Sequence, residues 1–372
     1  MRRRLLRLLG PALEQSKRLN LRDRVREIEY TLTGSDFESQ FLLYRVFRGV
    51  FPKTYGKRLR LRPAPLIKLH LKNEYPRASV TRRLGKFLKT EGGAGAVSPA
   101  ELADPEEGGR DARPSTKEDV YYGPFPSRAA AEKFASDSLD FFKMRRCVED
   151  LHPDPAFPGC VYSEMKMCLA PCFKGCTDDE YHAEVARVQA FLDTRGESFM
   201  HELAEQRERA SANLAFEEAA IVHARIEKLK PLLSQLPEIV QRIDQLKAVI
   251  VQRCAEADSA TLFLFAAGTL HGPVLFRIES GGEPQPIESR LRDELNNFPV
   301  RPVRSNLERT EHLAILKRWY YRSQRTGEIF FAGKNGEWPL RRIVRGIGRV
   351  FKREDAEEFS ATQPSAPPSQ PA

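Results

Sequence analysis

The sequence predicts an α+β protein built from several small domains. Its 372 residues exceed the roughly 150 that are typical of one domain. Two stretches of low complexity have little to bury and predict disorder. Five of the six cysteines fall between Cys147 and Cys176, which indicates a separate module. The predicted units are a partial α/β domain at 1–89, a disordered insertion at 90–119, a cysteine-rich metal-binding module at 120–180, a helical region at 181–245, a small α/β segment at 246–353 and a disordered tail at 354–372.

The first unit combines helix and strand patterns. Residues 1–9 have the pattern of a basic amphipathic helix, and the absence of serine argues against the alternative of a mitochondrial targeting segment. Alternating apolar residues from Ile28 to Leu32 predict a strand that ends at Gly34. Ser35 and Glu38 then form the pattern of a capping box, which predicts the start of a helix. The apolar face of that helix carries Phe37, Phe41, Tyr44 and Phe47, and a further strand is predicted at 66–71.

The cysteine cluster is the most informative chemical feature. No signal peptide and no run of about 18 apolar residues is visible, so we expect a cytoplasmic chain without a membrane span, in which thiols stay reduced. Four thiolates can hold zinc or an iron-sulfur cluster. The candidate ligands are Cys147, Cys160, Cys168 and Cys172, with Cys176 as a spare. Zinc sites usually have two tight cysteine pairs, so the wide spacing favours a cluster, while buried cysteines without metal are the simpler alternative.

A helical hairpin is predicted after the cysteines. Thr177 and Glu180 form a second capping-box pattern, and two further helices are expected between about Ser198 and Ser234. The second of them has a narrow apolar seam formed by Phe216, Ala219, Ala220, His223, Ile226 and Leu229. A hairpin this thin cannot bury both faces, so we expect it to pair with another segment or another protein. His223 is expected to be a packed or rim histidine, and not a ligand.

The last part of the chain predicts a β-hairpin at 260–278 and a helix at 311–321. It contains no recognisable constellation of catalytic acids. The net charge of +9 favours a polyanionic partner. A basic run could contact phosphates, although a solvated amphipathic tail is an equal alternative. The run comprises Arg341, Arg342, Arg345, Arg349, Lys352 and Arg353.

Several motifs occur in the order found in one family. They are Tyr122-Gly-Pro-Phe125, Phe142-Lys-Met-Arg-Arg-Cys147, Gly159-Cys160-Val-Tyr162, Met167-Cys-Leu-Ala-Pro-Cys172 and Leu214-Ala-Phe-Glu-Glu-Ala-Ala220. In this order they resemble UvrC, the nuclease subunit of the bacterial UvrABC nucleotide excision repair system. Residues 28–38 resemble a strand and helix of its N-terminal GIY-YIG nuclease domain. The resemblance spans about residues 1–279.

The resemblance implies a cofactor and two partners. Cys147, Cys160, Cys168 and Cys172 match cysteines associated with an iron-sulfur cluster of the four-iron four-sulfur type, with zinc as the alternative. Residues 202–233 match the UVR hairpin, which in the family pairs with the corresponding hairpin of the helicase subunit UvrB. The implied contact residues are Leu214, Phe216, Glu217, Ala220 and Ile226. DNA is the second implied partner.

The nuclease centre departs from the family pattern. Arg4 matches the catalytic arginine, but both motif tyrosines are absent. Leu43 occupies the position of the glutamate that binds the metal, and Glu38 lies on a different side of the helix. Phosphodiester hydrolysis needs a divalent cation held by carboxylates, so Mg²⁺ or Mn²⁺ is expected only if activity remains.

The chain therefore looks like a UvrC relative with its first strands missing and without the second nuclease and helix-hairpin-helix regions. Two functions remain open at this point. One is a repair subunit that nicks DNA together with UvrB, and the other is a non-catalytic adaptor that uses its hairpin to bind a partner. A zinc-containing regulator of a kinase or chaperone is a weaker third alternative, because paired Cys-x2-Cys motifs are absent.

Overall fold

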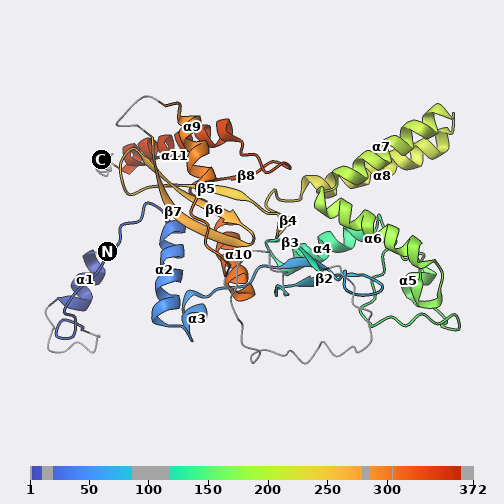
Figure 1. Ribbon diagram of the computed structural model, residues 1–372, viewed down its shortest axis with the longest axis horizontal. Helices are drawn as coiled ribbons and strands as arrows, with labels where there is room; N and C mark the ends of the chain where they lie inside the picture. Colours follow the sequence, from blue (N-terminus) through green and yellow to red (C-terminus); the bar gives the residue numbers. More distant parts are fainter. Residues whose placement is uncertain (1, 11–19, 86–117, 279–284, 304, 362–372) are drawn as a thin grey trace, which may run out of the picture.

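The computed structural model describes residues 2–10, 20–85, 118–278, 285–303 and 305–361. Two four-stranded antiparallel sheets form its framework, and helices cover them (Figure 1). The predicted α+β class is confirmed. The helical hairpin of α7 (Glu197–Ala212) and α8 (Phe216–Ser234) projects from the body, while α1 (Arg2–Leu9) lies far from it.

The first sheet has the strand order β2-β1-β3-β4. Its strands are β1 (Leu66–Leu69), β2 (Ala78–Thr81), β3 (Val120–Gly123) and β4 (Gln241–Arg242). Helix α4 (Arg128–Leu139) contacts β1 and β2, and α6 (Asp178–Asp193) contacts β4. Because β4 follows the hairpin in sequence, the cysteine module and the hairpin are inserted between two neighbouring strands of one sheet.

The second sheet has the order β7-β6-β5-β8 and is covered on both faces. Its strands are β5 (Ala248–Arg253), β6 (Ser259–Ala266), β7 (Thr269–Arg277) and β8 (Glu328–Phe331). One face packs on α9 (Ile287–Asn296) and α11 (Leu340–Ala361) through Val249 and Leu262. Phe263 on the other face contacts α2 (Asp36–Val50), and α10 (Asn306–Tyr320) completes that layer. Burial on both faces explains the nearly continuous apolar run of β6.

Helix α2 begins as predicted, but it does not pack on the first sheet. The Ser35 hydroxyl accepts a hydrogen bond from the Glu38 N–H at 3.1 Å, and Glu38 accepts one from the Gly34 N–H at 2.9 Å. The Phe37 ring lies 5.0 Å from that of Phe263 on the second sheet. Gly34 lies so close to the backbone of Cys254 that a Cβ there would clash. The first 89 residues are therefore divided between the two sheets, and α3 (Tyr55–Leu59) lies between them in sequence.

The strand predicted at 28–32 is wrong. Residues 25–33 form an extended segment without regular secondary structure. Its alternating side chains, Ile28, Tyr30 and Leu32, are all exposed. Alternation predicts a strand only where a neighbouring strand supplies hydrogen bonds, and within the described residues none lies beside this segment.

The C-terminal predictions are largely confirmed. The predicted β-hairpin is β6 and β7, and the predicted helix is α10, which begins earlier than expected. Helix α11 continues to Ala361 and so extends into the predicted tail at 354–372. Most of the insertion predicted at 90–119, and residues 362–372, lie outside the described residues.

Candidate functional site

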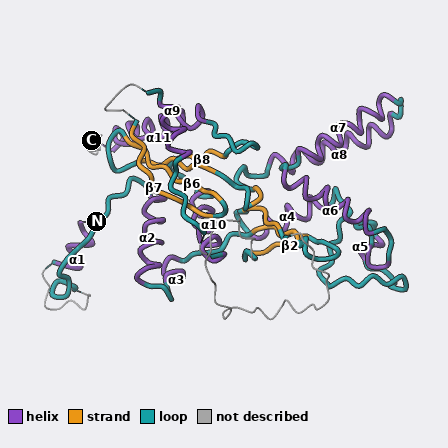
Figure 2. The backbone as a smooth tube through the Cα atoms, viewed as in Figure 1, coloured by secondary structure: helices purple, strands orange, loops and turns teal. Residues whose placement is uncertain are grey.

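The cysteine module lies between α4 and α6 and consists mostly of loops (Figure 2). Its regular elements are only α5 (Val161–Glu164) and the 3-10 turn η1 (Pro171–Phe173). Phe142 and Met144 anchor its first segment in the core. The Tyr181 hydroxyl of α6 accepts a hydrogen bond from the Arg145 N–H at 3.2 Å and donates one to the Pro76 carbonyl at 2.7 Å. The segment that leads to Cys147 is therefore held against both α6 and the first sheet.

The four predicted ligands lie in one region of this module. All four thiols are partly exposed. Burial raises the pKa of the Cys168 thiol, and the charges of Cys160, Cys172 and Cys147 raise it further. The pKa of Cys172 is raised by burial and then by Cys160 and Cys147. The structure thus brings together cysteines up to 25 residues apart in sequence (147 to 172). Among the described residues, no three His, Cys, Asp or Glu side chains are arranged closely enough to hold one metal ion.

Cys176 lies at the edge of this group. Its thiol pKa is raised first by burial and then by the neighbouring carboxylates of Glu180 and Asp178. Those carboxylates belong to the N-terminal turn of α6, where Thr177 and Glu180 form the predicted capping box. Negative neighbours disfavour a thiolate, so Cys176 suits the role of a spare better than that of a ligand.

Arg145 is a buried charged group beside one candidate ligand, Cys147. Only 2% of its surface is exposed. Its Nε donates to the Tyr75 carbonyl at 2.9 Å, and one terminal nitrogen donates to the Glu149 carbonyl at 2.9 Å. The same nitrogen lies 3.4 Å from the Sγ of Cys147. Arg145 therefore places a buried positive charge beside the first candidate ligand.

A tight turn places Cys160. Gly159 has φ +90, and a Cβ there would lie 2.9 Å from the Ser163 hydroxyl. That hydroxyl accepts from the Cys160 N–H at 2.8 Å and donates to the Cys160 carbonyl at 2.6 Å. The turn holds Cys160 at the N-terminus of α5 and explains the Gly159-Cys160 pattern by conformation.

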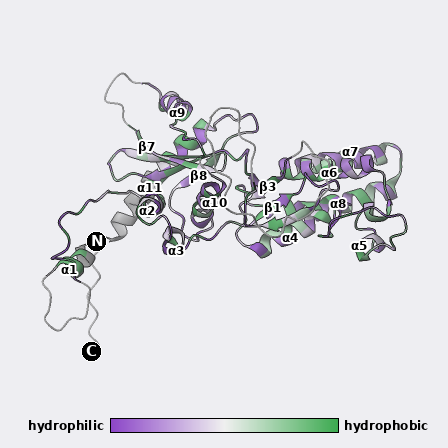
Figure 3. Cartoon of the chain, turned by 60° about the horizontal axis from the view of Figure 1, so that its bottom comes forward, coloured by the Kyte–Doolittle hydropathy of each residue, from purple (hydrophilic) through white to green (hydrophobic). Residues whose placement is uncertain are grey.

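The tip of the helical hairpin exposes large apolar side chains. Leu214 is 71% exposed, Phe216 65% and Ile221 65%. Glu217, Ala220 and His223 are also exposed. Leu214 has φ +59 in the turn between α7 and α8, a conformation that places it at the outer end of the hairpin. In Figure 3 α7 is coloured largely hydrophilic, so the apolar group at the tip stands out.

The predicted seam of α8 is only partly a contact surface. Ile226 and Leu229 are buried, together with Val222, where α8 packs on the rest of the protein. The assignment of Ile226 to a partner contact is therefore a prediction that the structure corrects. The apolar residues of the seam have helical spacing, but the two halves of the seam differ in burial. The C-terminal half packs against the rest of the protein, and the N-terminal half is exposed.

Two of the residues aligned with the nuclease motif, Leu43 and Glu38, lie in the described part of α2. Leu43 is exposed on α2. The carboxylate of Glu38 is occupied by the cap of that helix, and its pKa is raised by burial. Arg4 belongs to α1, but its side chain lies outside the described residues. Glu38 thus has a structural role as the cap of α2, and Leu43 offers no oxygen to a metal.

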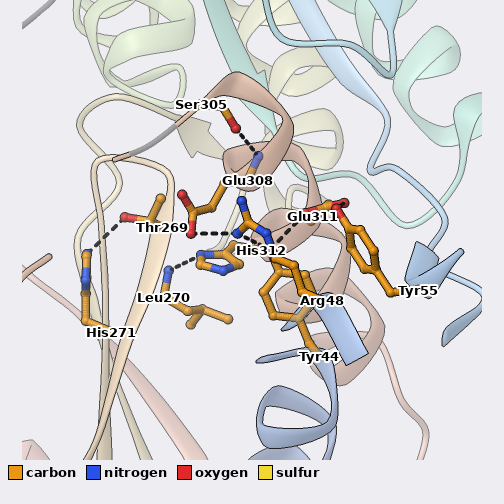
Figure 4. Close-up of polar contacts among 10 residues, drawn as sticks. All are labelled: Tyr44, Arg48, Tyr55, Thr269, Leu270, His271, Ser305, Glu308, Glu311 and His312. Atoms are coloured by element: carbon orange, nitrogen blue, oxygen red, sulfur yellow. Dashed lines mark hydrogen bonds and ion pairs between the residues drawn. The ribbon is translucent and has the colours of Figure 1, made fainter. Parts of the chain in front are cut away.

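A polar cluster between α2 and α10 was not predicted (Figure 4). Tyr44 and Tyr55 both donate to the carboxylate of Glu311, at 2.8 and 2.6 Å. Arg48 donates to the Tyr44 hydroxyl and to Glu308, both at 2.9 Å. The tyrosines and Arg48 lie more than 250 residues from the two glutamates in sequence, so no local pattern could have revealed the cluster.

Comparisons with known proteins agree with the motifs. The profile of the UvrC/Cho excinuclease, middle domain, matches residues 103–191, which include the four candidate ligands. The UvrABC system protein C of Idiomarina loihiensis is 36% identical over 110 residues, which are 30% of this chain and 18% of that protein. The protein of the same name from Carboxydothermus hydrogenoformans is 24% identical over 320 residues, 85% of this chain and 47% of that protein.

A third relative gives the same result. The UvrABC system protein C of Rickettsia africae is 26% identical over 253 residues, which cover 66% of this chain and 34% of that protein. The chain thus spans less than half the length of these relatives. No solved structure matches it. In the part of the chain that the structure describes, no helix is long and apolar enough to cross a membrane. The ordered motifs, the match of residues 103–191 to the UvrC/Cho middle domain and the similarity over much of the sequence agree, and they identify the chain as a relative of UvrABC system protein C.

Proposed function

We propose that this protein acts in nucleotide excision repair by binding a UvrB-type helicase subunit through the tip of its α7–α8 hairpin. The exposed Leu214, Phe216 and Ile221 support the proposal most strongly. An apolar group of this size on an otherwise hydrophilic hairpin is typical of a protein contact. Its match to the UVR motif, together with the relatives named as UvrABC system protein C, favours the hairpin of UvrB as partner.

Replacing Phe216 with alanine should weaken this association by about 2–4 kcal/mol, because aromatic anchors dominate interfaces. Isothermal titration of the full chain with the C-terminal hairpin of UvrB measures the effect. Leu307→Ala is the matched control, since Leu307 is also an exposed apolar side chain but lies on α10. Equal losses in the two variants, or unchanged affinity for Phe216→Ala, would contradict the proposed surface.

We further propose that Cys147, Cys160, Cys168 and Cys172 hold a four-iron four-sulfur cluster, with zinc as the alternative occupant. Four soft thiol donors close enough to raise one another's pKa support this, as does the buried guanidinium of Arg145 beside Cys147. The chemistry of such donors suits iron-sulfur clusters and zinc. Bound metal would cross-link a module that has little regular structure of its own.

The metal proposal predicts a loss that depends on position. Protein purified without oxygen should contain about four irons per chain and absorb visible light. Cys168→Ser should abolish the iron and make residues 142–181 sensitive to protease, because a ligand that closes the module is lost. Cys254→Ser should retain the iron, since Cys254 lies beyond β5. A colourless wild-type protein with stoichiometric zinc would show that zinc occupies the site and not an iron-sulfur cluster. A wild-type protein without metal would contradict both proposals.

Basic surface supports DNA as the second partner. Arg341, Arg342 and Arg345 are exposed on α11, whose Ile343 and Ile347 pack against the second sheet. Arg349 pairs with Glu328 at 2.7 Å, and the side chains of Lys352 and Arg353 lie outside the described residues. An anchored basic helix can contact phosphates in a fixed orientation.

The leucine at position 43 and the use of Glu38 as a helix cap favour an adaptor that binds DNA without cutting it. Affinity for a lesion-bearing duplex should fall steeply between 50 and 200 mM salt, by about 10³-fold if roughly six phosphates are contacted. Titrations at several salt concentrations measure this. Incubation with the duplex, UvrB and Mg²⁺ or Mn²⁺ should leave both strands intact. Incision that Arg4→Ala abolishes would show instead that a catalytic centre remains.

A further inference from the structure

A cavity of about 380 Å³ opens between α2, β7, α10 and the loop at 299–303. Its apolar wall includes Phe41, Leu270 and Val303. The volume lies at the lower end of the range for small-molecule sites, roughly 300–1,000 Å³. The cavity adjoins the polar cluster of Figure 4, so its lining is held by hydrogen bonds between elements distant in sequence.

His312 supplies a donor in this cavity. Its Nδ1 accepts a hydrogen bond from the Leu270 N–H at 3.0 Å, which leaves the proton of the neutral ring on Nε2. Burial lowers the pKa of His312 to about 4, so the ring is neutral at pH 7. Only 5% of the residue is exposed, and the residue lines the cavity. An N–H in the lining of a cavity suits a ligand that accepts a hydrogen bond.

The second histidine of the lining is already occupied. The Nε2 of His271 lies 2.9 Å from the Thr269 hydroxyl, and its Nδ1 accepts from the Arg301 N–H at 3.3 Å. Burial lowers its pKa as well. Both ring nitrogens of His271 are therefore engaged within the protein. His312 is the histidine whose Nε2–H can donate to a ligand.

Positive charge surrounds the opening. Arg45, Arg48 and Arg301 line it, and the one acidic residue among the described lining residues is Glu308, which lies 2.9 Å from Arg48. The side chains of Arg45 and Arg301 are exposed. Because the charges of Arg48 and Glu308 neutralise each other, the guanidinium groups of Arg45 and Arg301 are the ones that can attract an anion. Guanidinium groups suit phosphate oxygens because their N–H donors match that geometry.

We propose that this cavity binds a single nucleotide, with the phosphate at Arg45 and Arg301 and the nucleoside against the apolar wall, where the His312 Nε2–H donates to it. The cavity is large enough for a mononucleotide and not for an extended strand. The nucleotide could be free or be the terminal residue of a DNA strand. The proposal does not depend on the hairpin contact, the cysteines or any nuclease activity.

The test is titration of the full-length protein with thymidine 5′-monophosphate, thymidine and inorganic phosphate. The monophosphate should bind at least about tenfold more tightly than either part alone, since both halves of the site are then used. The Arg45→Ala/Arg301→Ala double variant should lose about tenfold or more in affinity for it. An Arg341→Ala/Arg342→Ala variant, which removes the same charge from α11, should bind it normally. Equal losses in the two double variants would overturn the proposal.

Two further variants separate a shaped site from diffuse attraction. A Cβ added at Gly49 meets nothing within 4 Å, and Gly49 lines the cavity, so Gly49→Leu should fill it and reduce binding without a change in charge. His312→Asn keeps an acceptor for the Leu270 N–H and removes the Nε2 donor, so affinity should fall several-fold while the melting temperature changes little. Unchanged binding in Gly49→Leu would exclude the cavity as the site.

A competition experiment identifies the source of the nucleotide. If a 5′-phosphorylated tetranucleotide displaces the monophosphate and binds more tightly than it, the ligand is the end of a DNA strand. Gly49→Leu should then weaken the binding of the tetranucleotide. Displacement by free nucleotides but not by the tetranucleotide indicates a soluble nucleotide. No binding of either ligand at millimolar concentration would overturn the proposal.

Discussion

Replacing Trp319 with alanine will lower the free energy of unfolding by about 3–5 kcal/mol, because a fully buried aromatic side chain leaves a large cavity. Only 1% of Trp319 is exposed. Its ring lies 5.1 Å from that of Phe37 and 5.0 Å from the guanidinium carbon of Arg325, and its Nε1 donates to the Thr326 carbonyl at 3.0 Å. The residue thus joins α10 to α2 and to the loop before β8.

Urea denaturation followed by circular dichroism measures this effect. Trp319→Phe is the control, because it keeps an aromatic ring but loses the hydrogen bond to Thr326, at a cost of about 1–2 kcal/mol. If the alanine variant lost less than the phenylalanine variant, the ring would not be part of the central packing. A change in the slope of the urea transition would indicate that α2 detaches as a separate step.

Sequence patterns of a few neighbouring residues correctly predicted helix starts and hairpins, because these features depend on residues close together in sequence. The capping boxes at Ser35 and Thr177 mark the starts of α2 and α6, since a cap depends on residues three positions apart. The β6–β7 hairpin follows from two apolar runs around Gly268, which has φ +81. The α7–α8 hairpin was also predicted from its helical period.

Features that depend on distant partners were not predicted. Ile28, Tyr30 and Leu32 have the alternation of a strand, but a strand needs a neighbour that the pattern cannot supply. The apolar face of α2 was recognised, yet nothing in its sequence shows that it packs against Phe263 in the second sheet. Ile226 was assigned to the same apolar seam as Phe216, and only the position of the surrounding core determines that one is buried and the other exposed.

The candidate site shows the same division. Cys147, Cys160, Cys168 and Cys172 could be named because thiols are rare and clustered, and the structure places them in one module. The cavity at His312 escaped prediction, since its lining comes from segments that begin at Phe41, Thr269 and Pro299. A single histidine within an apolar helix is usually a core residue, and its Nε2 is recognised as a donor only when the Leu270 N–H is seen to bond to Nδ1.

The second large effect concerns Glu311, whose replacement by leucine should lower the free energy of unfolding by about 3–5 kcal/mol. Glu311 is buried and accepts hydrogen bonds from Tyr44 and Tyr55. Burial, reinforced by this carboxylate, raises the pKa of Tyr55 to about 12, so the hydroxyl stays protonated as a donor. Leucine fills much of the same volume but accepts no hydrogen bond. Most of the loss should therefore come from the two hydroxyls left without an acceptor.

The triple variant Tyr44→Phe/Tyr55→Phe/Glu311→Leu separates this cause from a loss of packing. It removes both donors together with their acceptor, so no hydroxyl of the pair is left unsatisfied, and Arg48 retains Glu308 at 2.9 Å. Because replacing all partners by apolar groups is far less costly than removing one, the triple variant should recover most of the stability lost by Glu311→Leu. Urea denaturation of both variants measures the difference. A triple variant as unstable as the single one would show that Glu311 stabilises α10 through its charge or packing, and not as the acceptor for the two tyrosines.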